Sequence, residues 1–234
     1  LKIKEISIFY LSYVLIAISV IVIWTLLPSI SLIIFLMVAS YHFGKEDTQF
    51  LINKISFVNQ LLFFFKGSLI ILAPMFFNFE DTVFIFKFIL VDNELFYLTL
   101  SFIETKNILP IFITLSTLAS IYLIFEDFNF KKIIIFLDYI SILILNYFLS
   151  PLVAFTIYFC FLHSVRHSIT LIHEIDGQNL SNGIKKFIIK ALPLTILTII
   201  LALIGLYLLN NNYDLHSSIL KIIFIGLASL TFPH

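Results

Sequence analysis

Apolar residues occur along this chain in long runs, and the charged residues are concentrated in the short stretches between the runs. A helix needs about 20 apolar residues to cross the hydrocarbon core of a bilayer, and several runs approach or exceed this length. The candidate spans are residues 6–27, 30–43, 51–77, 108–125, 133–149, 152–172, 187–209 and 218–234. We therefore predict an all-α fold, a polytopic transmembrane helical bundle of about seven to eight helices in one integral membrane domain over residues 1–234.

The stretch 78–107 departs from this pattern, because acidic residues divide it into apolar pieces of only about ten residues. Pieces of this length are too short to cross a bilayer as single helices. We predict that the stretch is re-entrant or interfacial, so that it enters and leaves on the same side of the membrane.

Composition supports the membrane class and removes several others. The chain is 61% hydrophobic and 12% charged, whereas a soluble domain carries about 25% charged residues. The net charge is zero and no basic stripe occurs, so nucleic acid is not an expected partner. A single cysteine, Cys160, excludes an internal disulfide framework and a metal site built from cysteines.

Lysines are distributed unequally between the two sides of the predicted bundle. If the N-terminus lies in the cytoplasm, the loops on that side contain Lys45, Lys54, Lys131, Lys132, Lys185, Lys186 and Lys190. The opposite side then carries six acidic residues and only three lysines, Lys87, Lys106 and Lys221, and this lysine bias agrees with the positive-inside rule. We therefore predict a multi-pass protein of the cell (inner or plasma) membrane, in contact with the lipid bilayer, with the N-terminus of this chain cytoplasmic.

The histidines are the candidate functional residues. Under the predicted topology His42, His163, His167 and His234 lie in one depth zone near the cytoplasmic side, whereas His173 and His216 are expected in solvated loops. An imidazole in hydrocarbon is costly unless it is paired, hydrogen-bonded or bound to an ion, so an intramembrane cluster indicates function.

His163 and His167 are four residues apart, which places both rings on one helical face. This spacing lets both rings reach one ion at roughly 2 Å. The alternative is that they are core histidines bonded to backbone carbonyls or to Asp138. Because His42 is expected at the same depth, we favour a metal site, and the lack of thiolates favours iron, copper or zinc.

Charged residues near these histidines allow more than one interpretation. Glu46 and Asp47 could assist a zinc-bound water in hydrolysis, or could mark a charged helix end at the membrane surface. Arg166 lies inside the histidine pair and needs a partner, and Asp138 is the most plausible one. Lys66 interrupts the run 51–77; it could line a tunnel, but we favour a lysine that extends along a short half-helix toward the surface.

Four stretches of the sequence resemble one known family. They are 31–47 (SLIIFLMVASYHFGKED), 150–167 (SPLVAFTIYFCFLHSVRH), 224–234 (FIGLASLTFPH) and, more loosely, 22–28 around Trp24. The HFG-x-x-D and YFCF-x-HS-x-RH strings are fairly specific, and the sequence is similar to the Brp/Blh β-carotene 15,15'-dioxygenases of bacteria and haloarchaea. The likeness runs nearly end to end, although the part from about 76 to 130 is generic.

The resemblance implies a non-haem iron enzyme that uses Fe(2+) and O2 to cleave the central double bond of β-carotene into two molecules of all-trans-retinal. It also implies that a microbial rhodopsin could receive the product. His42, His163 and His167 match three of the family's four iron-binding histidines. The fourth belongs to a PHG-x-x-D motif of an N-terminal helix that this sequence lacks, which implies a fragment or an incomplete site.

The resemblance and the positions in the sequence also suggest residues around the ion or along a substrate channel. They are His234, Arg166, Asp138, Asp47, Tyr41, Phe43 and Phe159. Two alternatives stay open at this point. A histidine-rich membrane hydroxylase or desaturase would need about eight histidines for a di-iron site, and a small membrane transporter or scaffold would hold no stoichiometric metal.

Overall fold

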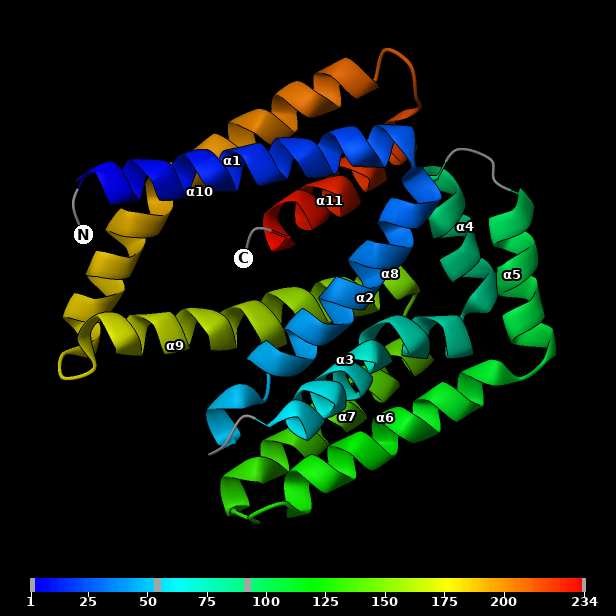
Figure 1. The fold of residues 1–234 in the computed structure, drawn as a ribbon, viewed down its shortest axis with the longest axis horizontal. Coiled ribbons are helices and arrows are strands. Elements are labelled where there is room, and N and C mark those ends of the chain that lie inside the picture. Colours follow the sequence, from blue (N-terminus) through cyan, green and yellow to red (C-terminus); the bar gives the residue numbers. More distant parts are fainter. Residues whose placement is uncertain (1–2, 53–55, 91–93, 233–234) are drawn as a thin grey trace.

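The computed structural model describes residues 3–52, 56–90 and 94–232 (Figure 1). Every regular element within these ranges is helical. Five helical stretches there are long and apolar enough to cross a membrane: Pro28–Leu51, Phe57–Phe77, Ile108–Phe125, Pro151–Asp176 and Leu180–Leu209. Leu11–Leu26 and Leu215–Thr231 are shorter apolar helices. The predicted all-α membrane bundle is therefore confirmed.

The first two helices meet at a proline. α1 (Ile3–Leu26) ends just before Pro28, which occupies the first turn of α2 (Pro28–Glu46). A proline has no N–H for the helix before it, but its fixed φ suits a first helical turn. In Figure 1, α1 lies beside α11 (Leu215–Thr231), and α2 descends from the end of α1 toward α3 (Phe57–Phe77). α2 extends beyond the predicted run 30–43, so Lys45 and Glu46 are still helical.

α3 (Phe57–Phe77) is the central helix and packs against α2, α4 (Phe79–Ile89), α6 (Ile108–Phe125) and α7 (Ile133–Phe148). Its contact with α2 is unusually close. A Cβ built on Gly44 would lie 1.8 Å from the Phe63 carbonyl oxygen, and one on Gly67 would lie 1.9 Å from the Ser40 carbonyl oxygen. Only glycine fits at either position, and small residues at a helix crossing allow this approach of two backbones in a membrane protein.

The stretch 78–107 contains two short helices, α4 (Phe79–Ile89) and α5 (Glu94–Thr105), of 11 and 12 residues. Their lengths match the short apolar pieces of the sequence, and a helix of this length spans well under 30 Å. Lys221 fixes the end of α4 by donating a hydrogen bond to the Ile89 carbonyl oxygen at 3.0 Å. The same-side entry and exit of this stretch stays a prediction.

The C-terminal part of the bundle begins with one continuous helical stretch, made of α8 (Pro151–Ile157), the π-helical turn η3 (Tyr158–His163) and α9 (Ser164–Asp176). α10 (Leu180–Leu209) and α11 (Leu215–Thr231) follow. Short 3-10 turns, η1 (Gln49–Leu51) and η2 (Phe130–Lys132), precede α3 and α7.

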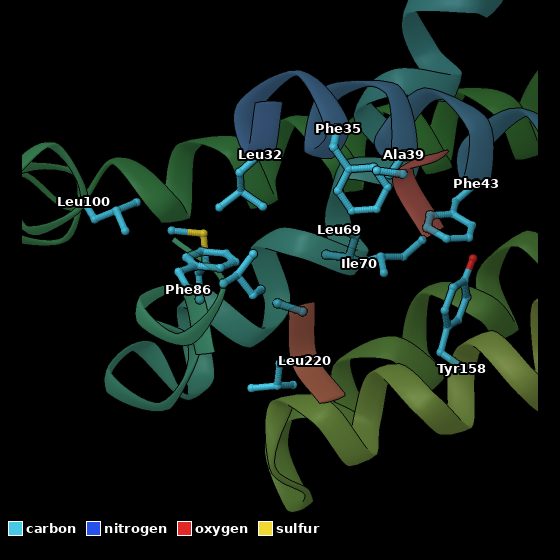
Figure 2. Packing of buried hydrophobic residues seen from close by; sticks show 14 of the residues in the cluster. Leu32, Phe35, Ala39, Phe43, Leu69, Ile70, Phe86, Leu100, Tyr158 and Leu220 are labelled. Carbon is cyan, nitrogen blue, oxygen red and sulfur yellow. The ribbon is translucent and has the colours of Figure 1, made fainter. Parts of the chain in front are cut away.

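The main apolar core lies between α2, α3, α4 and the α8–η3 stretch. Figure 2 shows Phe35, Ala39 and Phe43 of α2 near Leu69 and Ile70 of α3, with the ring of Tyr158 next to Phe43. A second cluster, formed by Phe63, Leu123 and Ile135, joins α3 to α6 and α7. The two clusters hold α2, α3 and η3 in fixed relation, and α2 carries His42, α3 carries Lys66 and η3 carries His163.

Candidate active site

A cavity of about 630 Å³ opens between α2, α3, α4, α8, η3, α9 and α11. Its volume lies within the usual range of small-molecule sites. Aromatic side chains make up much of its wall: Phe35, Phe43, Phe86, Phe155, Phe159 and Phe224. Among the described residues that line it there is no Asp, Glu, Lys or Arg, and the ionisable groups on the wall are Tyr13 and the imidazoles of His42, His163 and His167. The cavity therefore suits an apolar ligand.

The three imidazoles converge on one part of the wall. The ring centres of His42 and His163 are 5.8 Å apart, although the residues come from different helices. The rings of His163 and His167 are parallel within 2°, with their centres 6.4 Å apart. The i, i+4 spacing therefore places both rings on one face, as the sequence predicts, and α2 brings His42 to the same place.

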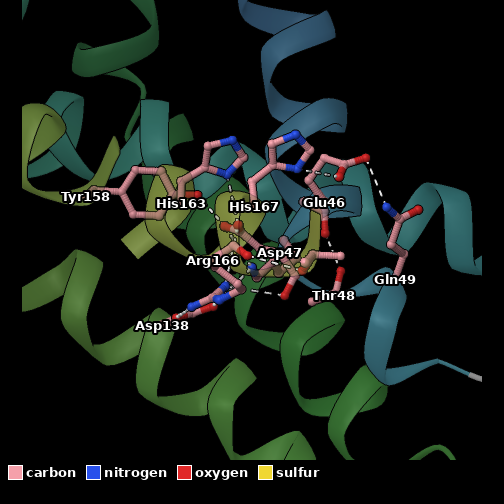
Figure 3. A network of polar contacts seen from close by, with 12 residues as sticks. Glu46, Asp47, Thr48, Gln49, Asp138, Tyr158, His163, Arg166 and His167 are labelled. Carbon is pink, nitrogen blue, oxygen red and sulfur yellow. Dashed lines mark hydrogen bonds and ion pairs between the residues drawn. The ribbon is translucent and has the colours of Figure 1, made fainter. Parts of the chain in front are cut away.

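Two carboxylates support the rings from behind. Nδ1 of His163 donates to Oδ1 of Asp47 at 2.9 Å, and Nδ1 of His167 lies 3.5 Å from Oε2 of Glu46. A carboxylate accepts hydrogen bonds, so the proton of His163 is assigned to Nδ1. Figure 3 shows that the opposite edges of both rings, which carry Nε2, are turned away from the carboxylates. A carboxylate bonded to one nitrogen of a histidine is typical of metal-binding imidazoles.

The π-helical turn η3 provides a second hydrogen bond to the Asp47 carboxylate. The hydroxyl of Tyr158 donates to Oδ2 of Asp47, while His163 holds Oδ1. In an α-helix, residues five apart lie about 140° from each other around the axis. The wider π turn, with its i→i+5 hydrogen bonds, brings them to nearly the same face. One carboxylate can therefore bind both side chains.

Four charged side chains form a buried cluster beneath the histidines. Arg166 makes two hydrogen bonds to Asp138, at 2.8 and 2.6 Å. Nζ of Lys66 lies 3.7 Å from Asp47 and 3.8 Å from Asp138. Lys66 and both carboxylates are almost fully buried, and the two cations balance the two anions. This balance matters because an unpaired buried charge costs several kcal/mol.

A sequence model of one family, described as "Beta-carotene 15,15'-dioxygenase", matches residues 1–234, the whole chain. The chain belongs to the β-carotene 15,15'-dioxygenase family. It is 30% identical over 225 residues to the β-carotene 15,15'-dioxygenase of uncultured marine bacterium 66A03, covering 96% of this chain and 76% of that relative. No solved structure matches this dioxygenase-family chain. Membership of this family argues against the two alternative interpretations, a membrane hydroxylase or desaturase and a small membrane transporter or scaffold.

Three imidazoles form a donor set of the kind that iron accepts, so the distances between the rings can be compared with those around one ion. Among the described residues, no three His, Cys, Asp or Glu side chains stand close enough together to hold an ion. Two imidazoles on one ion, each at roughly 2 Å, would have their centres about 5–6 Å apart. The pair His42–His163 meets this distance, and His163–His167 exceeds it slightly. The side chain of His167 is 32% exposed, so its ring has room to turn.

The structure brings most of the other predicted residues to this site. Phe43 and Phe159 line the cavity, with ring centres 4.7 and 5.8 Å from that of His163. Tyr41 is not part of the cavity wall and packs against the second apolar cluster instead. His234 lies outside the described residues.

Three further predictions concern charged or polar residues. The pairing of Arg166 with Asp138 is confirmed. His173 and His216 are exposed as expected, although they lie in helices rather than in loops. The interpretation of Asp47 as a surface charge is wrong, because its side chain is buried and holds His163.

The prediction that Lys66 extends toward the surface is also wrong. Lys66 is 3% exposed, and its ammonium group lies between Asp47 and Asp138. The close crossing of α2 and α3 at Gly44 and Gly67 brings the lysine near Asp47. The two carboxylates stabilise the ammonium charge inside the bundle, so the side chain does not extend to water.

Tyr158 is the site residue that the sequence interpretation missed. A helical wheel with the α period places Tyr158 well away from the face of His163, so it gives no reason to connect the two. The sequence predicts only that an aromatic residue next to the histidine pair is buried. Burial alone does not show whether its hydroxyl binds Asp47 or its ring simply packs in the core.

Proposed function

We propose that this protein cleaves β-carotene at its central 15,15' double bond with O2 and releases two molecules of retinal. The observation that carries the proposal is an apolar, aromatic cavity with three imidazoles on one wall, in a chain of the β-carotene 15,15'-dioxygenase family. In the balanced reaction the C=C bond breaks and each of its carbons receives one oxygen atom of O2. No proton is gained or lost.

We further propose that His42, His163 and His167 hold Fe(2+), which would supply binding and activation of O2. Asp47 and Glu46 support the rings of His163 and His167 for this role, because they engage the Nδ1 edges and leave the Nε2 edges turned the other way. An all-nitrogen donor set suits iron. The zinc-hydrolysis alternative lacks support, because both carboxylates are occupied by histidines and absent from the cavity wall.

The other residues of the cavity would bind and orient the substrate. Phe43 and Phe159 contact His163, Phe155 stacks on Phe159, and all three rings can pack against a conjugated chain. The reaction needs no general acid or base, and the described residues of the wall include no carboxylate or lysine. The bond that breaks is then decided by which part of the polyene the wall places beside the imidazoles.

The membrane location follows from the same chemistry. β-Carotene dissolves in the bilayer, and five described helical stretches are long and apolar enough to cross it. We propose a cell-membrane enzyme with the N-terminus of this chain in the cytoplasm, where the lysine-rich loops would face anionic lipid. Retinal released into the bilayer would be available to a retinal-binding partner such as a microbial rhodopsin.

The test is expression of a polypeptide containing residues 1–234 in a host that makes β-carotene. The expected result is loss of orange colour, retinal detected by chromatography, and about one iron per chain in the purified protein. His42→Ala and His163→Ala should abolish retinal formation, whereas His173→Ala and His216→Ala, at exposed positions, should not. Full cleavage by either cavity variant, or purified active protein without iron, contradicts the assignment.

A further inference from the structure

We propose that Tyr158 is a positioning residue for this reaction: its hydroxyl holds the Asp47 carboxylate in the orientation that fixes His163 for ion binding. The inference rests on the proposed function, because it concerns the ion that His163 would hold. Tyr158 does not line the cavity, so it is not a residue that would contact the substrate. It acts through Asp47.

The Asp47 carboxylate binds Tyr158 and His163 at the same time. Its two oxygens have separate partners, with Oδ2 accepting from Tyr158 and Oδ1 accepting from His163. Asp47 is 1% exposed, so water cannot replace a lost donor readily. Without the tyrosine hydroxyl, the carboxylate would be free to rotate toward Lys66 at 3.7 Å or toward Arg166 at 3.5 Å. Either rotation would move Oδ1 away from Nδ1 of His163.

The helix that carries Tyr158 and His163 contains a π turn at these residues. The π turn is the feature that brings Tyr158 and His163 to one face, and π turns within helices occur frequently at functional sites. The turn interrupts the regular α pattern just before the histidine pair. A helix that served only to cross the membrane would gain nothing from this irregularity, whereas a shared carboxylate requires it.

The packing of the ring shows that the hydroxyl can be removed without a cavity. The Tyr158 ring is 2% exposed and its centre lies 5.8 Å from that of Phe43. Tyr158→Phe keeps these ring contacts and deletes one oxygen atom. Its effect should therefore come from the lost hydrogen bond to Asp47.

The experiment compares iron binding and turnover of wild type and Tyr158→Phe in detergent. Loss of a supporting contact behind a metal ligand typically lowers metal affinity or activity about 10–100-fold. We expect an iron dissociation constant raised by about 10-fold or more and a reduced kcat, with an unchanged KM for β-carotene. The matched control is Tyr139→Phe, which removes a hydroxyl 2.5 Å from Thr117 Oγ1, away from the cavity. It should leave all three quantities unchanged.

A double-mutant cycle with Asp47→Asn tests whether Tyr158 acts through Asp47. If it does, Tyr158→Phe should change iron affinity by less than about 3-fold once Asp47 is already replaced. Thermal unfolding of each iron-free variant separates a folding defect from a positioning effect, and we expect Tyr158→Phe to unfold near wild type.

Each possible outcome decides between the two proposals. Wild-type iron affinity and kcat in Tyr158→Phe, or a change in KM alone, overturns the role of Tyr158 and leaves the proposed function intact. A wild-type protein that binds no iron and forms no retinal overturns both proposals.

Discussion

Asp138→Asn tests whether the stability of the protein depends on the equal number of positive and negative charges in the buried cluster beneath the histidines. The substitution keeps the size of the side chain but removes its charge. Arg166, which makes two short hydrogen bonds to this carboxylate, and Lys66, at 3.8 Å, would then share only Asp47. The cluster would change from neutral to one net positive charge inside the bundle.

The magnitude follows from burial. Removing one partner of a fully buried ion pair costs about 3–5 kcal/mol. Because the Arg166 side chain is 21% exposed, solvent screens part of its charge, and we expect a loss of about 2–4 kcal/mol in the free energy of unfolding. The double variant Asp138→Asn with Arg166→Met restores neutrality, with Lys66 paired to Asp47. It should be more stable than Asp138→Asn alone.

The assay is unfolding in mixed micelles with increasing denaturing detergent. Trp24, the chain's one tryptophan, is buried and can report the transition by fluorescence. Iron content and retinal formation should fall together with stability in Asp138→Asn. The reasoning is refuted if Asp138→Asn lies within 0.5 kcal/mol of wild type, a difference typical of an unimportant surface position. It is also refuted if the double variant is no more stable than Asp138→Asn alone.

Two further predictions concern the helix crossing and a helix cap. Gly44→Ala places a methyl group against the Phe63 carbonyl oxygen, so it should destabilise the protein by about 1–3 kcal/mol and lower retinal formation. Gly226→Ala is the control, because a methyl group there meets open space and should have neither effect. Equal unfolding midpoints for the two variants would contradict this prediction. Hydrogen bonds from Ser217 hold the pKa of Asp214 below its ordinary value. The ionised Asp214 carboxylate therefore stabilises the folded protein at neutral pH, and this stabilisation is lost as the pH falls through the lowered pKa. Unfolding of Asp214→Ala should differ from wild type at pH 7 and converge on it in acid, and a constant difference would refute the cap.

The sequence predicts the parts of the fold that follow from local pattern. The run 108–125 coincides with α6, because uncharged apolar residues fill it and a charged turn follows it. The pairing of Arg166 with Asp138 was also predictable, since a guanidinium at that depth requires an anion. The His163–His167 pair shares a face for the same local reason, the helical period.

Other features depend on tertiary contacts that no local pattern contains. Whether Lys66 reaches water or a carboxylate depends on how closely α2 approaches α3, and two glycines on different helices set that distance. The contact between Tyr158 and Asp47 depends on a change of helical period over one turn. The start of α3 at Phe57 was also missed, although Lys54 already interrupts the predicted run 51–77.

The cavity wall is assembled from two sets of helices with different tasks. The imidazoles and their charged partners come from α2, α3, α7, η3 and α9, whereas Phe86 of α4 and Phe224 of α11 contribute only apolar surface. Volume can therefore be added or removed at Phe86 or Phe224 without touching a polar contact of the site. Exchanges at these two positions would change the shape of the cavity, while the wall that carries the imidazoles would remain as it is.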